Sequence, residues 1–311
     1  MEEAPKAKPW WPDTTLECPV SRSEQEWIEA SMSWCGREFG QDVLRRDIVR
    51  PTDFLRPPPG TAAPEPIAAL VSRVCALMQV SLAEIKVNLF DASAARNKAG
   101  TRGSGRKYAV GHFRMLDGQP VIDLDQSESA DRAHLTAIIA HELGHVRLHG
   151  EGRITADRPD SERLTDLLTV YFGLGIFTAN AALRYTRDNR NWSVLPVGYL
   201  DERTLNASRN DGYKRLGYLS EQEFGYALGC YCWLRGETVP GWATHLNPGL
   251  QGYLTRSLAY LAKAGQGNDL PTQRLLGRVV RCGNAAIRVV SIPAHQVSPL
   301  GLVLPDVGRG L

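Results

Sequence analysis

Two histidines four residues apart, with a glutamate beside the first, are the residues of this chain best placed to do chemistry. They are His141, Glu142 and His145, in the sequence His-Glu-Leu-Gly-His. On an α-helix, residues i and i+4 project from nearly the same face, about 6 Å apart along the axis. Both imidazoles can then reach one metal ion, and Glu142 lies close enough to act on a water that the ion holds. We predict a zinc site with His141 and His145 as ligands and Glu142 as general base.

A catalytic zinc ion needs three protein ligands and one open position, so a third ligand has to come from outside this pentapeptide. His149 lies one turn beyond His145, but three histidines along one straight helix cannot converge on a single tetrahedral ion. The metzincin pattern is also excluded, because position 151 is Glu instead of His and position 148 is Leu instead of Gly. A second helix must therefore supply the ligand.

Glu162 and Asp166 stand one turn apart in the next helical segment, and the 17 residues from His145 to Glu162 leave room for the chain to reverse. We predict that Glu162 is the third zinc ligand. Asp166 would accept the outer N–H of a ligand histidine, which fixes the tautomer of the ring. The alternative is a solvated acidic helix face. It is disfavoured because Asp166 is surrounded in the sequence by Leu164, Leu167 and Leu168, and a buried unpaired charge is costly.

The combination of His141-Glu-Leu-Gly-His145 with Glu162-x-x-x-Asp166 resembles the gluzincin metallopeptidases. The order of strands, motif helix and glutamate helix is similar to that of the compact minigluzincin and ImmA/IrrE-like proteins, over about residues 85 to 180. The resemblance implies zinc-dependent hydrolysis of peptide bonds, with one Zn²⁺ ion and a peptide or protein substrate. The flanks on either side match no family.

The resemblance also implies that an edge strand before the motif helix binds the substrate backbone by strand addition. Here that strand would comprise Val121, Ile122, Asp123 and Leu124. The family usually adds a tyrosine or histidine that stabilises the oxyanion, and no spacing rule chooses among the candidates Tyr171, Tyr199, Tyr213, Tyr218 and His245. His134 lies two turns before His141 and is expected at the cleft wall or the surface.

An α+β fold is predicted to position these residues, with a small mixed or antiparallel sheet packed on the motif helix and the glutamate helix. Alternating residues predict strands at 85–90, 108–113 and 120–124, the last two joined at Asp117-Gly118. The motif helix should run from an N-cap at Ser129 to Gly150, and the glutamate helix from 161 to 177. Further helices are expected from Ser23, and at 67–80, 220–235 and 250–264.

Composition shifts divide the chain into four predicted segments. These are an N-terminal strap and helix at 1–60, a zincin-like catalytic core at 61–185, a helical subdomain at 186–265, and a β-rich or irregular tail at 266–311. The proline-rich stretch at 56–66 is interpreted as the spacer between the first two. The glycine-rich stretch at 99–107 is interpreted as a hairpin connection, because no helix follows it that could bind phosphate.

The charge balance, 36 basic against 34 acidic residues, gives no electrostatic reason to expect a nucleic-acid or membrane partner. The first residues lack the features of a signal peptide, and no apolar run reaches about 18 residues. Six cysteines are too sparse for a disulfide scaffold, which predicts reduced, mostly buried thiols. We therefore expect a cytoplasmic protein, with its oligomeric state left open.

Two other functions stay open from the sequence. One is a metal-containing regulatory or partner-binding protein with latent or no peptidase activity, which the large flanks favour. The other is a zinc hydrolase that acts on a non-peptide amide. Substrate identity does not follow from the sequence, because specificity pockets are built by side chains that only the fold brings together.

Overall fold

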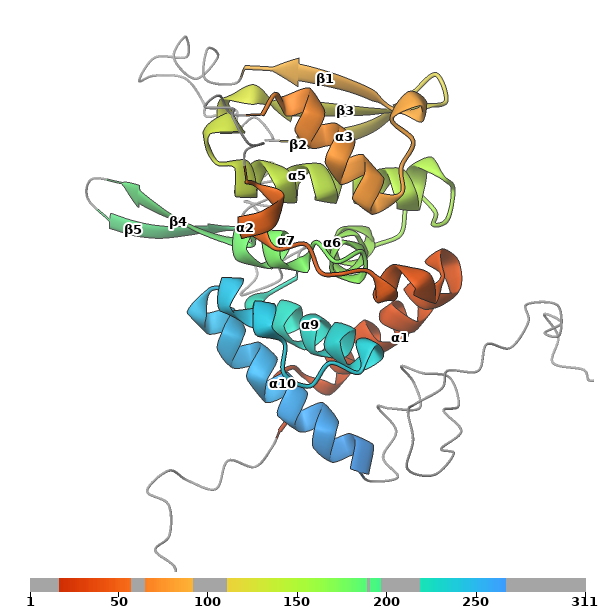
Figure 1. Ribbon diagram of the computed structural model, residues 1–311. Helices are drawn as coiled ribbons and strands as arrows, with labels where there is room; N and C mark the ends of the chain where they lie inside the picture. Colours follow the sequence, from red (N-terminus) through yellow and green to blue (C-terminus); the bar gives the residue numbers. More distant parts are fainter. Residues whose placement is uncertain (1–16, 57–64, 92–110, 189–190, 197–218, 267–311) are drawn as a thin grey trace, which may run out of the picture.

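A computed structural model of the protein describes residues 17–56, 65–91, 111–188, 191–196 and 219–266. Within this part of the chain the fold is α+β, mostly helical with a small three-stranded mixed sheet, as the sequence predicts. The layers follow one another from the sheet through α3 and α5, then α6 and α7, to α9 and α10, with α1 beside the lower layers (Figure 1). The predicted tail at 266–311 lies, apart from its first residue, outside the described residues.

The sheet consists of β1 (Lys86–Phe90), β3 (Gln119–Asp125) and β2 (Gly111–Leu116), in that spatial order. β1 runs parallel to β3, and β2 runs antiparallel to it. Asp117 and Gly118, with φ of 50° and 79°, form the expected two-residue turn between β2 and β3. The prediction that Val121–Leu124 forms an edge strand is wrong, because β3 is paired on both sides. Among the described residues, β1 and β2 are the outer strands of this sheet.

The motif helix α5 (Arg132–His145) lies between the sheet and helices α6 and α7. It begins later than predicted, because the carboxylate of Asp131, and not the hydroxyl of Ser129, caps its first turn by accepting the His134 N–H at 3.0 Å. A π-helical turn (Val146–Gly150) continues it to the predicted end. Every residue from His134 to Val146 is buried, as expected for a helix packed on all sides.

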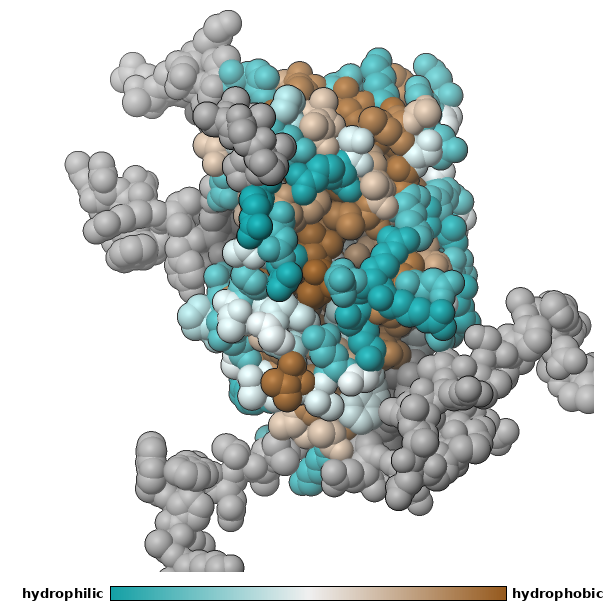
Figure 2. Space-filling model, in the orientation of Figure 1, coloured by the Kyte–Doolittle hydropathy of each residue, from teal (hydrophilic) through white to brown (hydrophobic). Residues whose placement is uncertain are grey.

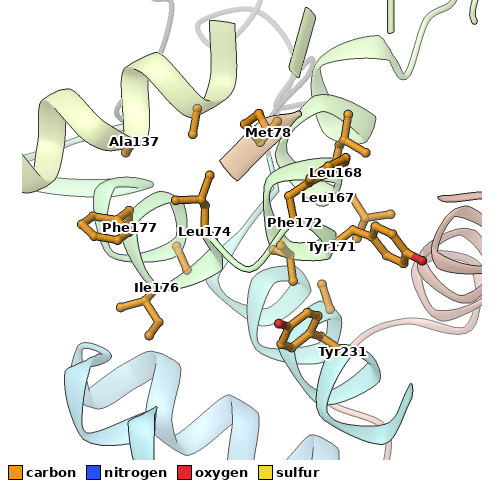
Figure 3. Close-up of a cluster of buried hydrophobic side chains, with 14 of the residues drawn as sticks. Met78, Ala137, Leu167, Leu168, Tyr171, Phe172, Leu174, Ile176, Phe177 and Tyr231 are labelled. Carbon is orange, nitrogen blue, oxygen red and sulfur yellow. The ribbon is translucent and has the colours of Figure 1, made fainter. Parts of the chain in front are cut away.

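The glutamate segment forms two helices where the sequence predicts one. These are α6 (Ser161–Tyr171) and α7 (Gly175–Ala181), separated at Gly173, whose φ of 82° is a left-handed conformation that ends a helix. Side chains at the end of α6 and in α7 pack with Met78, Ala137 and Tyr231 in the core (Figure 3). The break therefore lets the chain turn back into the same core.

Further helices of the described chain pack against α5 or α6. The N-cap of α1 (Arg22–Phe39) is Ser21, two residues before the predicted Ser23, because Ser21 forms the capping box with Glu24. α3 (Ile67–Met78) and α9 (Glu221–Arg235) agree with the predictions to within two residues, and Ser220 and Glu223 form the predicted capping box. The other described elements are η1 (Gln41–Arg45), α2 (Pro51–Phe54), η2 (Leu82–Glu84), η4 (Gln126–Ala130), β4 (Leu183–Asp188), β5 (Asn191–Pro196), η6 (Gly241–His245) and α10 (Pro248–Gln266).

Hydrophobic residues reach the surface on the face that Figure 2 shows, and hydrophilic residues lie on either side of them. No helix in the described part of the chain is long and apolar enough to cross a membrane.

Five cysteines are free thiols and four of these are buried, which agrees with the prediction, whereas Cys282 lies outside the described residues. The predicted glycine-rich connection at 99–107 also lies outside them.

Helices α9 and α10 approach closely because α9 has glycines where they cross. A Cβ added to Gly225 would lie 2.3 Å from the Cβ of Tyr253, and one added to Gly229 would lie 2.6 Å from the Cβ of Ser257. Real side chains do not approach so closely, so alanine at either position would force the two helices apart.

We expect Gly225→Ala to lower the free energy of unfolding by about 1–3 kcal/mol through this overpacking, although alanine favours helix. Chemical denaturation measures the change. Gly252→Ala is the matched control, since Gly252 lies on α10 with no atom within 4 Å of an added Cβ. The control should keep or gain stability, and equal effects of the two substitutions would contradict the packing argument.

Candidate metal centre

Three side chains predicted as metal ligands meet between α5 and α6. The Nε2 atoms of His141 and His145 lie 3.1 and 3.3 Å from the same oxygen, Oε2 of Glu162. One potential ligand atom from each of the three residues lies within 4.8 Å of the others. Both histidines are buried, whereas the side chain of Glu162 is 38% exposed. The group is therefore closed on the side of the core and open to solvent beside Glu162.

Asp166 holds the first histidine in the predicted manner. Its Oδ1 lies 2.9 Å from Nδ1 of His141, and its Oδ2 accepts the backbone N–H of Leu219 at 3.1 Å. An ionised carboxylate only accepts hydrogen bonds, so Nδ1 carries a proton toward Asp166, and a bound metal ion would take the place of the proton on Nε2. No pattern in the sequence indicates Leu219, which lies 53 residues beyond Asp166 along the chain.

The hydrogen bonds between His141, His145 and Glu162 shift the pKa values of His141 and Glu162. Burial lowers the pKa of His141, but hydrogen bonds to Asp166 and Glu162 outweigh it, so that the pKa lies well above its ordinary value. Burial raises the pKa of Glu162, and its hydrogen bonds to His141 and His145 outweigh that effect and lower it. Glu162 therefore presents an ionised carboxylate, the charge state that a divalent cation requires of such a ligand, whereas His141 would release a proton when a metal ion binds.

Glu142 lies beside this group with one carboxylate oxygen unused. The residue is 2% exposed, and its Oε2 is buried without a hydrogen-bond partner among the described residues. Burial raises the pKa of its carboxyl group above the ordinary value. A buried carboxylate oxygen without a partner is costly in isolation. Two imidazole nitrogens, a carboxylate and this oxygen therefore fit a zinc ion and a water molecule.

Strand β2 supplies residues of the site that the sequence did not indicate. The ring of Phe113 stacks on His145, with centroids 5.7 Å apart, and the backbone of Phe113 is hydrogen-bonded to Glu142. A Cβ on Gly111 would lie 2.6 Å from Ile138 and 2.8 Å from Oε1 of Glu142, so glycine leaves the space that Glu142 fills. The alternation along β2 could have indicated this face but not what it packs against.

His149 and His134 do not belong to the ligand group. Nε2 of His149 pairs with the hydroxyl of Ser161 at 2.6 Å, and its ring stacks on Phe113 and His145. His149 is therefore excluded as a ligand in this arrangement, as expected. His134 is buried and lies 3.7 Å from Glu128, so it is not a surface histidine.

The structure separates the other candidates. Tyr171 is fully buried and donates its hydroxyl to the Gly40 carbonyl at 2.8 Å, which leaves it committed to the core. His245 ends a 3₁₀ turn, where its carbonyl accepts a hydrogen bond from the side chain of Asn180. Asp123 of β3 pairs with Arg114 and Asn88. The remaining tyrosine candidates, Tyr199, Tyr213 and Tyr218, lie outside the described residues.

We expect Asp166→Asn to lower the free energy of unfolding of the metal-free protein by about 1–3 kcal/mol, because an amide cannot accept from both His141 and Leu219. Thermal unfolding in the presence of a chelator measures the change. Asp157→Asn, which changes an exposed carboxylate in the loop before α6, should leave stability within about 0.5 kcal/mol. Equal midpoints for the two variants would contradict the role given to Asp166.

Comparison with known proteins assigns no relative to this chain. No family model, no curated protein and no solved structure matches it. The chemistry of the centre therefore has to be inferred from its own residues and their geometry.

Proposed function

We propose that the protein is a zinc-dependent metallopeptidase of gluzincin type. The observation that carries the proposal is the convergence of His141, His145 and Glu162 beside the buried carboxylate of Glu142. Two imidazoles and one carboxylate are the ligand set of zinc hydrolases that keep an open coordination position. A purely structural zinc site would be closed by a fourth protein ligand instead, and no fourth member joins the group within the described residues.

Each residue then has a definite task. Zinc, when bound, supplies a Lewis acid that activates a water molecule and polarises a carbonyl group. Glu142 takes the proton of the attacking water and passes it to the leaving nitrogen, for which a pKa raised by burial is suited. Asp166 keeps the proton of His141 on Nδ1, so that Nε2 remains free as a ligand.

The open edge of β2 is the proposed place for the substrate backbone, in place of the paired strand β3. β2 packs on α5, and its Phe113 lies against both His145 and Glu142. A peptide added to this edge would pass beside the metal ligands and form backbone hydrogen bonds. The proposed substrate is therefore an extended peptide or protein segment. The proposed location is cytoplasmic, with which the reduced thiols are consistent.

We expect the purified protein to hold about one zinc ion per chain, and Glu162→Gln to lose most of it, because a neutral amide is a poor zinc ligand. Elemental analysis and titration with a zinc-sensitive dye measure the content. Glu84→Gln, which changes an exposed glutamate in the turn before β1, should keep the full amount. A wild-type protein that takes up no zinc would overturn the proposal.

We expect Glu142→Gln to retain zinc and to lower the rate of peptide hydrolysis by about 10²–10⁴-fold, the usual contribution of a general base. Cleavage of a peptide library, followed by mass spectrometry, measures the rate, with Glu84→Gln again as the control. Zinc uptake without cleavage of any peptide would favour the metal-containing regulatory protein. Cleavage of simple amides alone would favour a non-peptide amidohydrolase.

A further inference from the structure

His145, the second proposed ligand, has a partner on α6 that has no role in the mechanism proposed above. The hydroxyl oxygen of Thr165 lies 3.4 Å from Nδ1 of His145, and Thr165 is fully buried. The same hydroxyl lies 2.9 Å from the carbonyl oxygen of Ser161, to which it donates its proton. Thr165 stands next to Asp166, the residue that pairs with Nδ1 of His141.

The direction of these two hydrogen bonds follows from the number of protons. A threonine hydroxyl has one proton and two lone pairs, and here the proton is given to the Ser161 carbonyl. Toward His145 the hydroxyl can only accept, so a hydrogen bond between the two residues requires the ring proton on Nδ1. Nε2 of His145, which lies 3.3 Å from Oε2 of Glu162, is then the nitrogen that would bind a metal ion.

The methyl group of Thr165 contributes separately. A Cβ added to Gly144 would lie 2.7 Å from Cγ2 of Thr165, so this methyl packs directly on the backbone of α5 beside His145. Threonine therefore combines an acceptor for the ring with a methyl that fills the contact between the two helices. Serine supplies only the acceptor and valine only the apolar branches, which allows the two contributions to be separated.

We propose that Thr165 is a positioning residue that fixes the tautomer and orientation of His145, as Asp166 does for His141. The proposal rests on the proposed zinc site. In this arrangement one face of α6 provides a ligand, Glu162, and one orienting group for each of the two histidines on α5. A neutral hydroxyl binds the ring more weakly than a carboxylate does, so the two histidines are held with unequal strength.

Zinc affinity tests the proposal without reference to activity. We expect Thr165→Val to bind zinc about 10-fold more weakly than wild type, the lower end of the usual effect of an outer-shell partner. Thr165→Ser should stay within about threefold of wild type, because it keeps the acceptor. Competition with a chelating dye measures the affinity. In the zinc-loaded protein, the Nδ1–H signal of His145 in proton NMR should exchange faster with water in Thr165→Val alone.

Thr136→Val is the matched control. Thr136 is also fully buried and also donates its hydroxyl to the carbonyl four residues earlier, but on α5 and with Arg132 as the acceptor. This variant should bind zinc as wild type does. Equal affinity of Thr165→Val and wild type, or an equal loss in both valine variants, would overturn the proposal while the zinc site stands. A wild-type protein without zinc would overturn both, and the two failures are therefore distinguishable.

Discussion

The burial of ionisable groups between α5 and α6 constrains how the neighbouring elements pack. His141, His145 and Glu142 are buried, and such groups are tolerated inside a protein only when they are paired or bind an ion. Glu162 reaches both histidines only because α5 and α6 approach closely, which the glycine at position 144 permits. On the other side of α5, Gly111 of β2 leaves the space for Glu142. One glycine in α5 and one in β2 thus allow the close packing around this group.

The flanks that resemble no family brace this centre. At the start of α6, Trp27 of α1 donates its indole N–H to Asp160 at 2.7 Å, and the Arg163 guanidinium lies over the same indole. The hydrogen bond from Arg158 holds the pKa of Asp160 at about 2, so this anchor stays ionised at neutral pH. The N-terminal helix therefore fixes the end of α6 that carries Glu162.

The C-terminal helices are joined to the centre as well. Asp166 accepts the N–H of Leu219, immediately before α9, and Tyr226 of α9 donates its hydroxyl to the buried Glu29 of α1 at 2.6 Å. One hydrophobic cluster extends from α1 through α5 and α6 to α9 and α10. Through Asp166, His141 is thus connected to Leu219, which lies outside residues 85 to 180.

Features that depend on short-range spacing could be predicted from the sequence. The i, i+4 spacing of His141 and His145 and the turn at Asp117-Gly118 are local patterns, and each appears in the structure where predicted. The pairing of Asp166 with a histidine also follows from the leucines around it, because a buried acid needs a partner.

Which elements lie side by side could not be predicted from the sequence, because it is set by packing between distant parts of the chain. Strand order depends on crossovers and not on alternation. The sequence pattern therefore does not show that β3 is the central strand, and the predicted edge position is wrong. The contacts of Phe113, Thr165 and Leu219 with the site link residues 20 to 53 positions apart, and each of these residues alone has the character of ordinary core. The candidate metal-binding residues follow a local sequence pattern, whereas the residues that contact them are brought together by packing between distant parts of the chain.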